Sequence, residues 1–147
     1  MSSIVAQNEW SCALACVISL ANDHGIQATQ QQVALTFSSS FPEWASRSGL
    51  LTRIEILRLC ELLGLPLGYV LVTSDLSEFL AAFSKRYSRW VGAFVLVHHP
   101  THHCLRLFSV SGEAGELLDP GQHSSSRGVV RWSELEQRHP EFILICQ

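Results

Sequence analysis

The most reactive side chain in this sequence is the thiol of Cys12, which stands where a helix-like apolar pattern begins in AQNEWSCALACVISLANDHG. A free thiol has a pKa near 8.5, so only a few per cent of it is the nucleophilic thiolate at neutral pH. The unpaired N–H groups and partial positive charge at a helix start both favour the anion. Cys12 is therefore a candidate nucleophile. The alternative is a small buried apolar residue, which describes Cys16, one turn later, better than Cys12.

Four of the seven histidines fall within six residues, at His98, His99, His102 and His103. Pro100 keeps pairs four residues apart from sharing one turn of a helix. Apart from Cys104, no thiol or carboxylate at ligand spacing completes a set, so we expect no metal and no other cofactor. Two interpretations stay open for this segment: a plain histidine-rich turn, and a general base for Cys12. The base falls best on His103, at the mouth of a predicted strand.

Two further side chains complete a candidate site. Asp119, in ELLDPG, lies on the strand that returns from a hairpin beginning at His103, and antiparallel pairing brings the two ends together. Its carboxylate can then hold the second nitrogen of the imidazole. Taken alone, Asp-Pro-Gly indicates a turn. Gln7, five residues ahead of Cys12, can offer its side-chain amide to a developing oxyanion.

Hydrophobic spacing and turn residues predict the elements that position these side chains. Thr29, the capping box of Thr52 and Glu55, and a second box of Ser133 and Glu136 mark helix starts. Helices are predicted over 12–24, 29–37, 52–63 and 75–87, with a short one after 132. Strands are predicted over 68–72, 92–97, 103–110, 128–132 and 142–146, and from 117 after a turn at 111–116. Loops are predicted over 38–49 and 120–128.

Helices first and strands later favour an α+β fold, in which an N-terminal helical layer packs on a C-terminal antiparallel β-sheet. A chain of 147 residues fits one domain, over 1–147. The net charge of −3 and the lack of extended basic clusters argue against nucleic acid as a partner. The five cysteines form no C-x-x-C pair, and there is no signal peptide and no apolar run of about 18 residues. We therefore expect a soluble, cytoplasmic protein without a transmembrane segment.

Taken together and in this order, these residues resemble the C39 peptidases, a family of papain-like cysteine proteases. The resemblance lies in Gln7, Cys12 at a helix start, a histidine opening a late strand, and Asp119 before Pro120. The segments GLLTRIEILRLCELLGLPL, DLSEFLAAF and WSELEQRHPEFILI extend it over nearly the whole chain. Family members usually form the N-terminal domain of bacterial peptide-exporting ABC transporters, and they cut bacteriocin leader peptides after a double glycine.

The resemblance implies a papain-like fold and a thiol peptidase that works through a thioester. It makes Cys12 the nucleophile, His103 the general base and later acid, Asp119 the orienting carboxylate and Gln7 the oxyanion donor. The implied partner is a polypeptide substrate or leader peptide, with an exporter as a further associate. The sequence has no G-x-x-x-x-G-K-[ST] loop and no spanning helices, so we expect a free-standing bacterial enzyme.

Two alternatives stay open. Ala13 stands where the family normally has glycine, and Gln7 lies one residue closer to Cys12 than is usual. Both departures favour a catalytically weak or inactive module that binds an extended peptide. The other alternative is an acyl transferase or deamidase on the same scaffold, because an amine can resolve a thioester in place of water.

Overall fold

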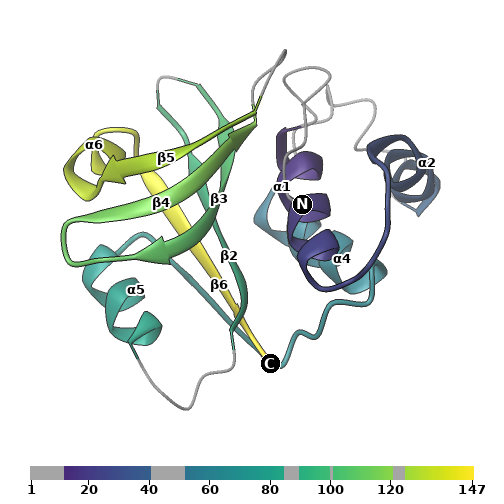
Figure 1. Ribbon diagram of the computed structural model, residues 1–147, viewed down its shortest axis with the longest axis horizontal. Helices are drawn as coiled ribbons and strands as arrows, with labels where there is room; N and C mark the ends of the chain where they lie inside the picture. Colours follow the sequence, from purple (N-terminus) through teal and green to yellow (C-terminus); the bar gives the residue numbers. More distant parts are fainter. Residues whose placement is uncertain (1–11, 41–51, 85–89, 100, 121–124) are drawn as a thin grey trace.

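The computed structural model describes residues 12–40, 52–84, 90–99, 101–120 and 125–147 (Figure 1). The described helices are α1 (Cys12–Asp23), α2 (Gln30–Ser40), α4 (Arg53–Leu62), α5 (Leu76–Phe83) and α6 (Trp132–Glu136). The described strands are β1 (Tyr69–Thr73), β2 (Trp90–Val97), β3 (His103–Val110), β4 (Ala114–Pro120), β5 (Ser125–Arg131) and β6 (Pro140–Cys146). Within these ranges, no helix has the length and apolar character that crossing a bilayer requires.

The strands form one antiparallel sheet in the order β1-β6-β2-β3-β4-β5. Strands β2 to β5 follow one another as hairpins, so each pairs with its neighbour in sequence. Strand β6 instead enters between β1 and β2, with Ile145 opposite Val70 on one side and Ile143 opposite Phe94 on the other. The predicted α+β fold with an antiparallel sheet is confirmed.

Helices cover both faces of this sheet (Figure 1). Successive side chains of a strand point to opposite faces, so Phe94 and Val95 of β2 enter different cores. Phe94 packs in the cluster of α1, α2 and α4, which form the predicted N-terminal helical layer. Val95 packs in the cluster that holds Phe79 of α5 and Leu135 of α6. The sheet is therefore the middle layer of the fold.

Three helices begin at the side chains that the sequence predicts. The hydroxyl of Thr29 accepts a backbone N–H at 3.2 Å ahead of α2. Thr52 and Glu55 form a complete capping box at the start of α4, and the chain leaves that helix through Gly64 at a φ of 81°. The carboxylate of Asp75 accepts two N–H groups of the first turn of α5. Each start depends on residues at most four apart, which is why the local sequence predicts it.

The predicted capping box at Ser133 is wrong. Helix α6 begins one residue earlier, at Trp132, and no side chain caps it. The indole of Trp132 is buried, and its Nε1 donates to the carbonyl of Ser111 at 2.9 Å. This tertiary contact, rather than the local spacing of Ser133 and Glu136, sets the start of α6.

Other element bounds differ from the prediction because strand pairing extends them. Strand β4 begins at Ala114, inside the predicted turn, and continues through Asp119 and Pro120, which pair with β5 rather than form a turn. Strand β5 begins at residue 125, within the predicted loop 120–128. Helix α2 runs to Ser40, past its predicted end, and α5 ends at Phe83. The predicted loop over 41–49 and residues 85–87 lie outside the described residues.

Candidate active site

Cys12 is the first residue of α1, the helix that lies against β3 (Figure 1). The helix is buried from Cys12 to Ala21, because its small and aliphatic side chains contact the sheet on one side and α2 and α4 on the other. Cys12 itself is 4% exposed. Within the described residues the thiol thus lies at the N-terminal end of a buried helix, the position expected from the sequence, where the helix dipole favours an anion.

His103 and Asp119 meet across neighbouring strands. His103 is the first residue of β3, and Asp119 lies near the end of β4, its antiparallel partner. Imidazole Nε2 lies 2.5 Å from Oδ1 of Asp119. This contact leaves the other ring nitrogen for the thiol of Cys12, with which His103 shares a second side-chain hydrogen bond. The hairpin thus joins the two residues as expected from the sequence.

The two neighbours of His103 both favour its charged form. Hydrogen bonds from the ring to Asp119 and Cys12 raise the pKa of His103 from its usual 6.5 to about 9, against the opposing effect of burial. In return, the hydrogen bond to His103 lowers the pKa of Asp119 below its usual 3.8. A raised pKa for the imidazole and a lowered pKa for the carboxyl are the two shifts expected of one ion pair. At neutral pH the site therefore holds an imidazolium beside a carboxylate, and the imidazolium contacts Cys12.

The other four cysteines are buried in the core and free of disulfides. Cys16 is fully buried, and its sulfur donates to the carbonyl of Cys104 at 3.4 Å. Burial raises the pKa of Cys60 to about 12, and a hydrogen bond with Cys16 together with burial raises that of Cys104. These two thiols stay protonated and inert at neutral pH. Cys12 is the cysteine that contacts a charged imidazole.

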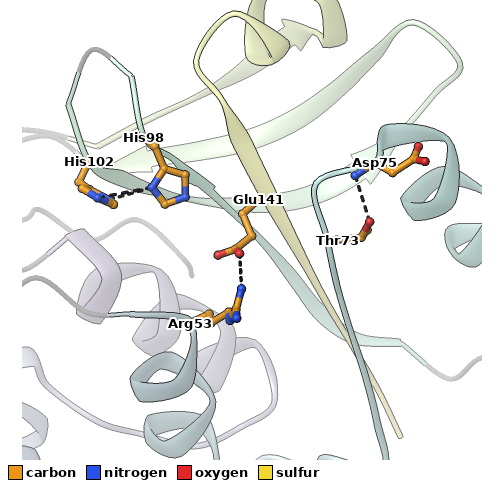
Figure 2. Close-up of polar contacts among 6 residues, drawn as sticks. All are labelled: Arg53, Thr73, Asp75, His98, His102 and Glu141. Carbon is orange, nitrogen blue, oxygen red and sulfur yellow. Dashed lines mark hydrogen bonds and ion pairs between the residues drawn. The ribbon is translucent and has the colours of Figure 1, made fainter.

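The remaining histidines of the cluster lie at the exposed β2–β3 turn. His98 and His102 face each other there, with their Nδ1 atoms 3.2 Å apart (Figure 2). The neighbouring ion pair joins Arg53 of α4 to Glu141 of β6 at 2.6 Å. Over the described residues, no three or more His, Cys, Asp or Glu side chains converge to hold a metal ion. The contact between His98 and His102 therefore involves neither His103 nor Asp119.

One polar cluster was not expected from the sequence. Arg106, on β3, is 7% exposed and binds Ser19 and Asp23 of α1, at 2.8 Å from the hydroxyl and 2.5 Å from the carboxylate. Burial lowers the pKa of Arg106, although Asp23 acts in the opposite direction. A charged residue at a buried position of the apolar strand HCLRLFSV was the available signal.

The predicted oxyanion donor Gln7 lies outside the described residues. Ala13, the residue after the thiol, is buried at 2% exposure in the α1 cluster. The structure therefore brings together Cys12, His103 and Asp119, from α1, β3 and β4.

No protein-family model and no curated protein matches the sequence. A solved structure does match: a double glycine motif protease from an AMS/PCAT transporter, in complex with the leader peptide. The two chains are 14% identical and superpose with a TM-score of 0.66, over 98% of this chain and 90% of the other. This chain thus has the fold of that protease, and the resemblance to the C39 peptidases is confirmed for the fold.

Proposed function

We propose that this chain is a papain-like cysteine peptidase, with Cys12 as nucleophile, His103 as acid and base, and Asp119 as the carboxylate that orients the imidazole. The observation that carries the proposal is the contact of His103 with both Cys12 and Asp119. The fold supports it, because the matching solved structure is a double glycine motif protease. A peptide that ends in two glycines before the cleaved bond is the substrate to test first.

Acylation begins when the thiolate of Cys12 attacks the scissile carbonyl carbon. The carbonyl oxygen becomes an oxyanion beside the N–H groups at the start of α1, where Gln7 is the proposed side-chain donor. The imidazolium of His103 then gives its proton to the leaving amine, and the C–N bond breaks. The products of this step are a free amine and a thioester on Cys12.

Deacylation uses the imidazole that the first step leaves neutral. His103 takes a proton from a water molecule, whose oxygen attacks the thioester carbon. The C–S bond breaks, the peptide leaves as a carboxylic acid that loses its proton to solvent, and the thiolate and imidazolium are restored. Asp119 stabilises the imidazolium at the start and the end of the cycle and fixes the ring, so that one nitrogen always faces Cys12.

The test uses the full chain with two probes, iodoacetamide and a synthetic peptide carrying a Gly-Gly site. We expect wild-type protein to be alkylated at Cys12 and to cleave the peptide, and Cys12→Ala to do neither. Cys16→Ala is the matched control, because this thiol lies on the same helix as Cys12 but is fully buried and donates to the carbonyl of Cys104 on β3. Equal alkylation of Cys12 and Cys16, or cleavage by Cys12→Ala, refutes the proposal.

The burial of Cys12 favours a second candidate function, a module that binds a peptide without cutting it. A residue 4% exposed offers a substrate little access to its sulfur. Ala13 adds a methyl group where the C39 family normally has glycine. A stable complex with the uncleaved Gly-Gly peptide, equally tight for wild type and Cys12→Ala, would support this function over peptide hydrolysis.

A further inference from the structure

One face of α1 carries a continuous row of polar groups and thiols. Its members recur at intervals of four, three and four residues, the spacing that places side chains on one stripe of an α-helix. They are Cys12, Cys16, Ser19 and Asp23. The row therefore runs from the first residue of the helix to the last, along a helix whose other residues are apolar except Asn22.

Every member of this row contacts β3. Cys12 and Cys16 contact the first two residues of the strand, through the side chain of His103 and the carbonyl of the following residue. Ser19 and Asp23 both bind the guanidinium of Arg106, at 2.8 Å and 2.5 Å. The order of the contacts is the same along both elements, so α1 and β3 run in the same direction.

The distance along α1 between its contacts with His103 and Arg106 matches the distance between those two residues along β3. Seven residues of an α-helix, from Cys12 to Ser19, rise about 10 Å. Three residues of a β-strand, from His103 to Arg106, also span about 10 Å. Rotating or sliding α1 by one residue would break both contacts together.

Hydrophobic burial does not by itself fix this alignment, because apolar contacts are non-directional. Arg106 is a costly residue to bury: its Nε has no hydrogen-bond partner, and a buried ion pair adds little net stability compared with an apolar replacement. The Arg106 contacts instead fix the orientation of α1, since one guanidinium binds two groups on the same side of that helix.

We propose that Arg106 is a positioning residue, which fixes the rotation and height of α1 against β3 by binding Ser19 and Asp23 and thereby holds Cys12 at His103. The inference rests on the proposed function, which makes Cys12 and His103 the reacting pair. Arg106 touches neither the thiol nor the imidazole in this role. It acts through the helix that carries the thiol.

The test compares Arg106→Met with the matched control Arg127→Met in the full chain. Both arginines lie over the ring of Phe108, at 4.4 Å and 3.8 Å, and both form an ion pair. The partner of Arg127 is Glu116 of β4 rather than a residue of α1. Methionine keeps an unbranched apolar stem in either position. The milder variant Asp23→Asn changes the exposed end of the Arg106 contact, where the carboxylate is 34% exposed.

Two readouts report on the alignment rather than on stability. The first is the pKa of His103, followed by NMR from its value of about 9, which should fall when the Cys12 contact is lost. The second is the rate at which iodoacetamide alkylates Cys12 at pH 7, which should fall about tenfold, the size of effect expected when a hydrogen bond to a charged group is lost. A thermal unfolding scan of each variant shows whether it is folded.

We expect Arg106→Met and Asp23→Asn to lower the His103 pKa and to slow the alkylation of Cys12. Arg127→Met should change neither quantity. Folded Arg106→Met and Asp23→Asn proteins with the wild-type His103 pKa and alkylation rate would overturn the positioning role. If Arg106→Met does not fold, Asp23→Asn decides the question. A wild-type protein that neither cleaves the Gly-Gly peptide nor is alkylated faster than a free thiol refutes the peptidase, and the His103 titration then still decides whether Arg106 positions Cys12.

Discussion

His103 combines two unlike neighbours, a carboxylate on β4 and a thiol on α1. The carboxylate of Asp119 has the larger influence on the charge of the ring, and the thiol of Cys12 the next. The residue is only partly buried, with 22% of its side chain exposed. Both partners therefore act on a group that solvent can reach.

Removing either partner should lower the pKa of His103 from about 9, because each raises it. We expect Asp119→Asn to lower the His103 pKa more than Cys12→Ala does, because the hydrogen bond to Asp119 raises that pKa more than the hydrogen bond to Cys12. Titration of the His103 ring protons by NMR measures both shifts. A Cys12→Ala protein whose His103 still titrates near 9 would show that the thiol and the imidazole do not interact.

The proposed peptide cleavage should lose rate at alkaline pH. The imidazolium of His103 is the proposed acid, so the rate should fall as pH rises through about 9, where that proton is lost. Cleavage of the Gly-Gly peptide between pH 5 and 10 measures this. A rate that still climbs above pH 9 contradicts the role of the imidazolium.

The histidines of the turn provide an internal comparison for the same role. His103→Ala should lower the cleavage rate about a hundredfold or more, since a general acid and base is lost. His98→Ala should leave the rate within about twofold, because His98 pairs with His102 on the exposed turn. Equal losses in the two variants would assign the chemistry to the turn as a whole.

The pattern of strands and turns predicted the contact of His103 with Asp119 but not the contacts of Arg106. His103 and Asp119 are 16 residues apart and joined by one hairpin, so the pairing rule of antiparallel strands suffices. Arg106 and Ser19 are 87 residues apart and belong to elements of different kinds. Local patterns do not predict which helix covers which strand, so that contact required the structure.

At the scale of the elements, α1 and the sheet approach closely at Gly92. A Cβ atom at this position of β2 would lie 2.6 Å from Cδ1 of Leu20, which is fully buried on α1. That separation is shorter than any ordinary carbon–carbon contact, so the buried side chain of Leu20 would have to move. The glycine is thus required by the packing of the helix rather than by its own backbone conformation.

Gly92→Ala should therefore lower the free energy of unfolding by about 1–3 kcal/mol, the usual cost of overfilling a packed core. Urea unfolding measures this change. Gly112→Ala is the control, because a Cβ there meets nothing within 4 Å. Equal stability of the two variants would mean that α1 adjusts freely against β2.

Element starts were predictable where the signal was local and unreliable where a distant residue intervened. The capping box of Thr52 and Glu55 works through hydrogen bonds within one turn, and it marks the start of α4 correctly. Ser133 and Glu136 have the same spacing, yet the buried indole of Trp132 sets the start of α6. A pattern of four letters does not include that tertiary contact.

At the scale of the whole molecule, the ion pair of His103 and Asp119 links stability to pH. The raised pKa of His103 stabilises the fold fully below about 6.5, and this contribution is lost as pH rises through about 9. The lowered pKa of Asp119 acts in the other direction, with a contribution that is present above 3.8 and lost as pH falls through the lower folded-state value. The pair therefore stabilises the fold most between these limits.

The difference in unfolding free energy between wild type and His103→Gln should follow this profile. It should be largest between about pH 4 and 6.5 and shrink toward pH 10. Urea unfolding at a series of pH values measures it. A difference that stays constant through pH 10 would show that the ion pair adds nothing to the fold.

The fold class was predictable, but the order of the strands was not. Apolar runs separated by turns predict the hairpins from β2 to β5, because each joins neighbours in sequence. Nothing local predicts that β6 enters between β1 and β2, since Val70 and its partner Ile145 are separated by about half of the chain. The sequence likewise does not predict which helices cover which face of the sheet.

The position of β6 has a consequence for synthesis on the ribosome. Strands β1 and β2 are translated long before residues 140–146, yet each pairs with β6 along one edge. Until those residues emerge, the edges of β1 and β2 that β6 later covers stay open, and open strand edges are sites for misassociation. A single late segment thus completes the sheet and closes both of these edges at once.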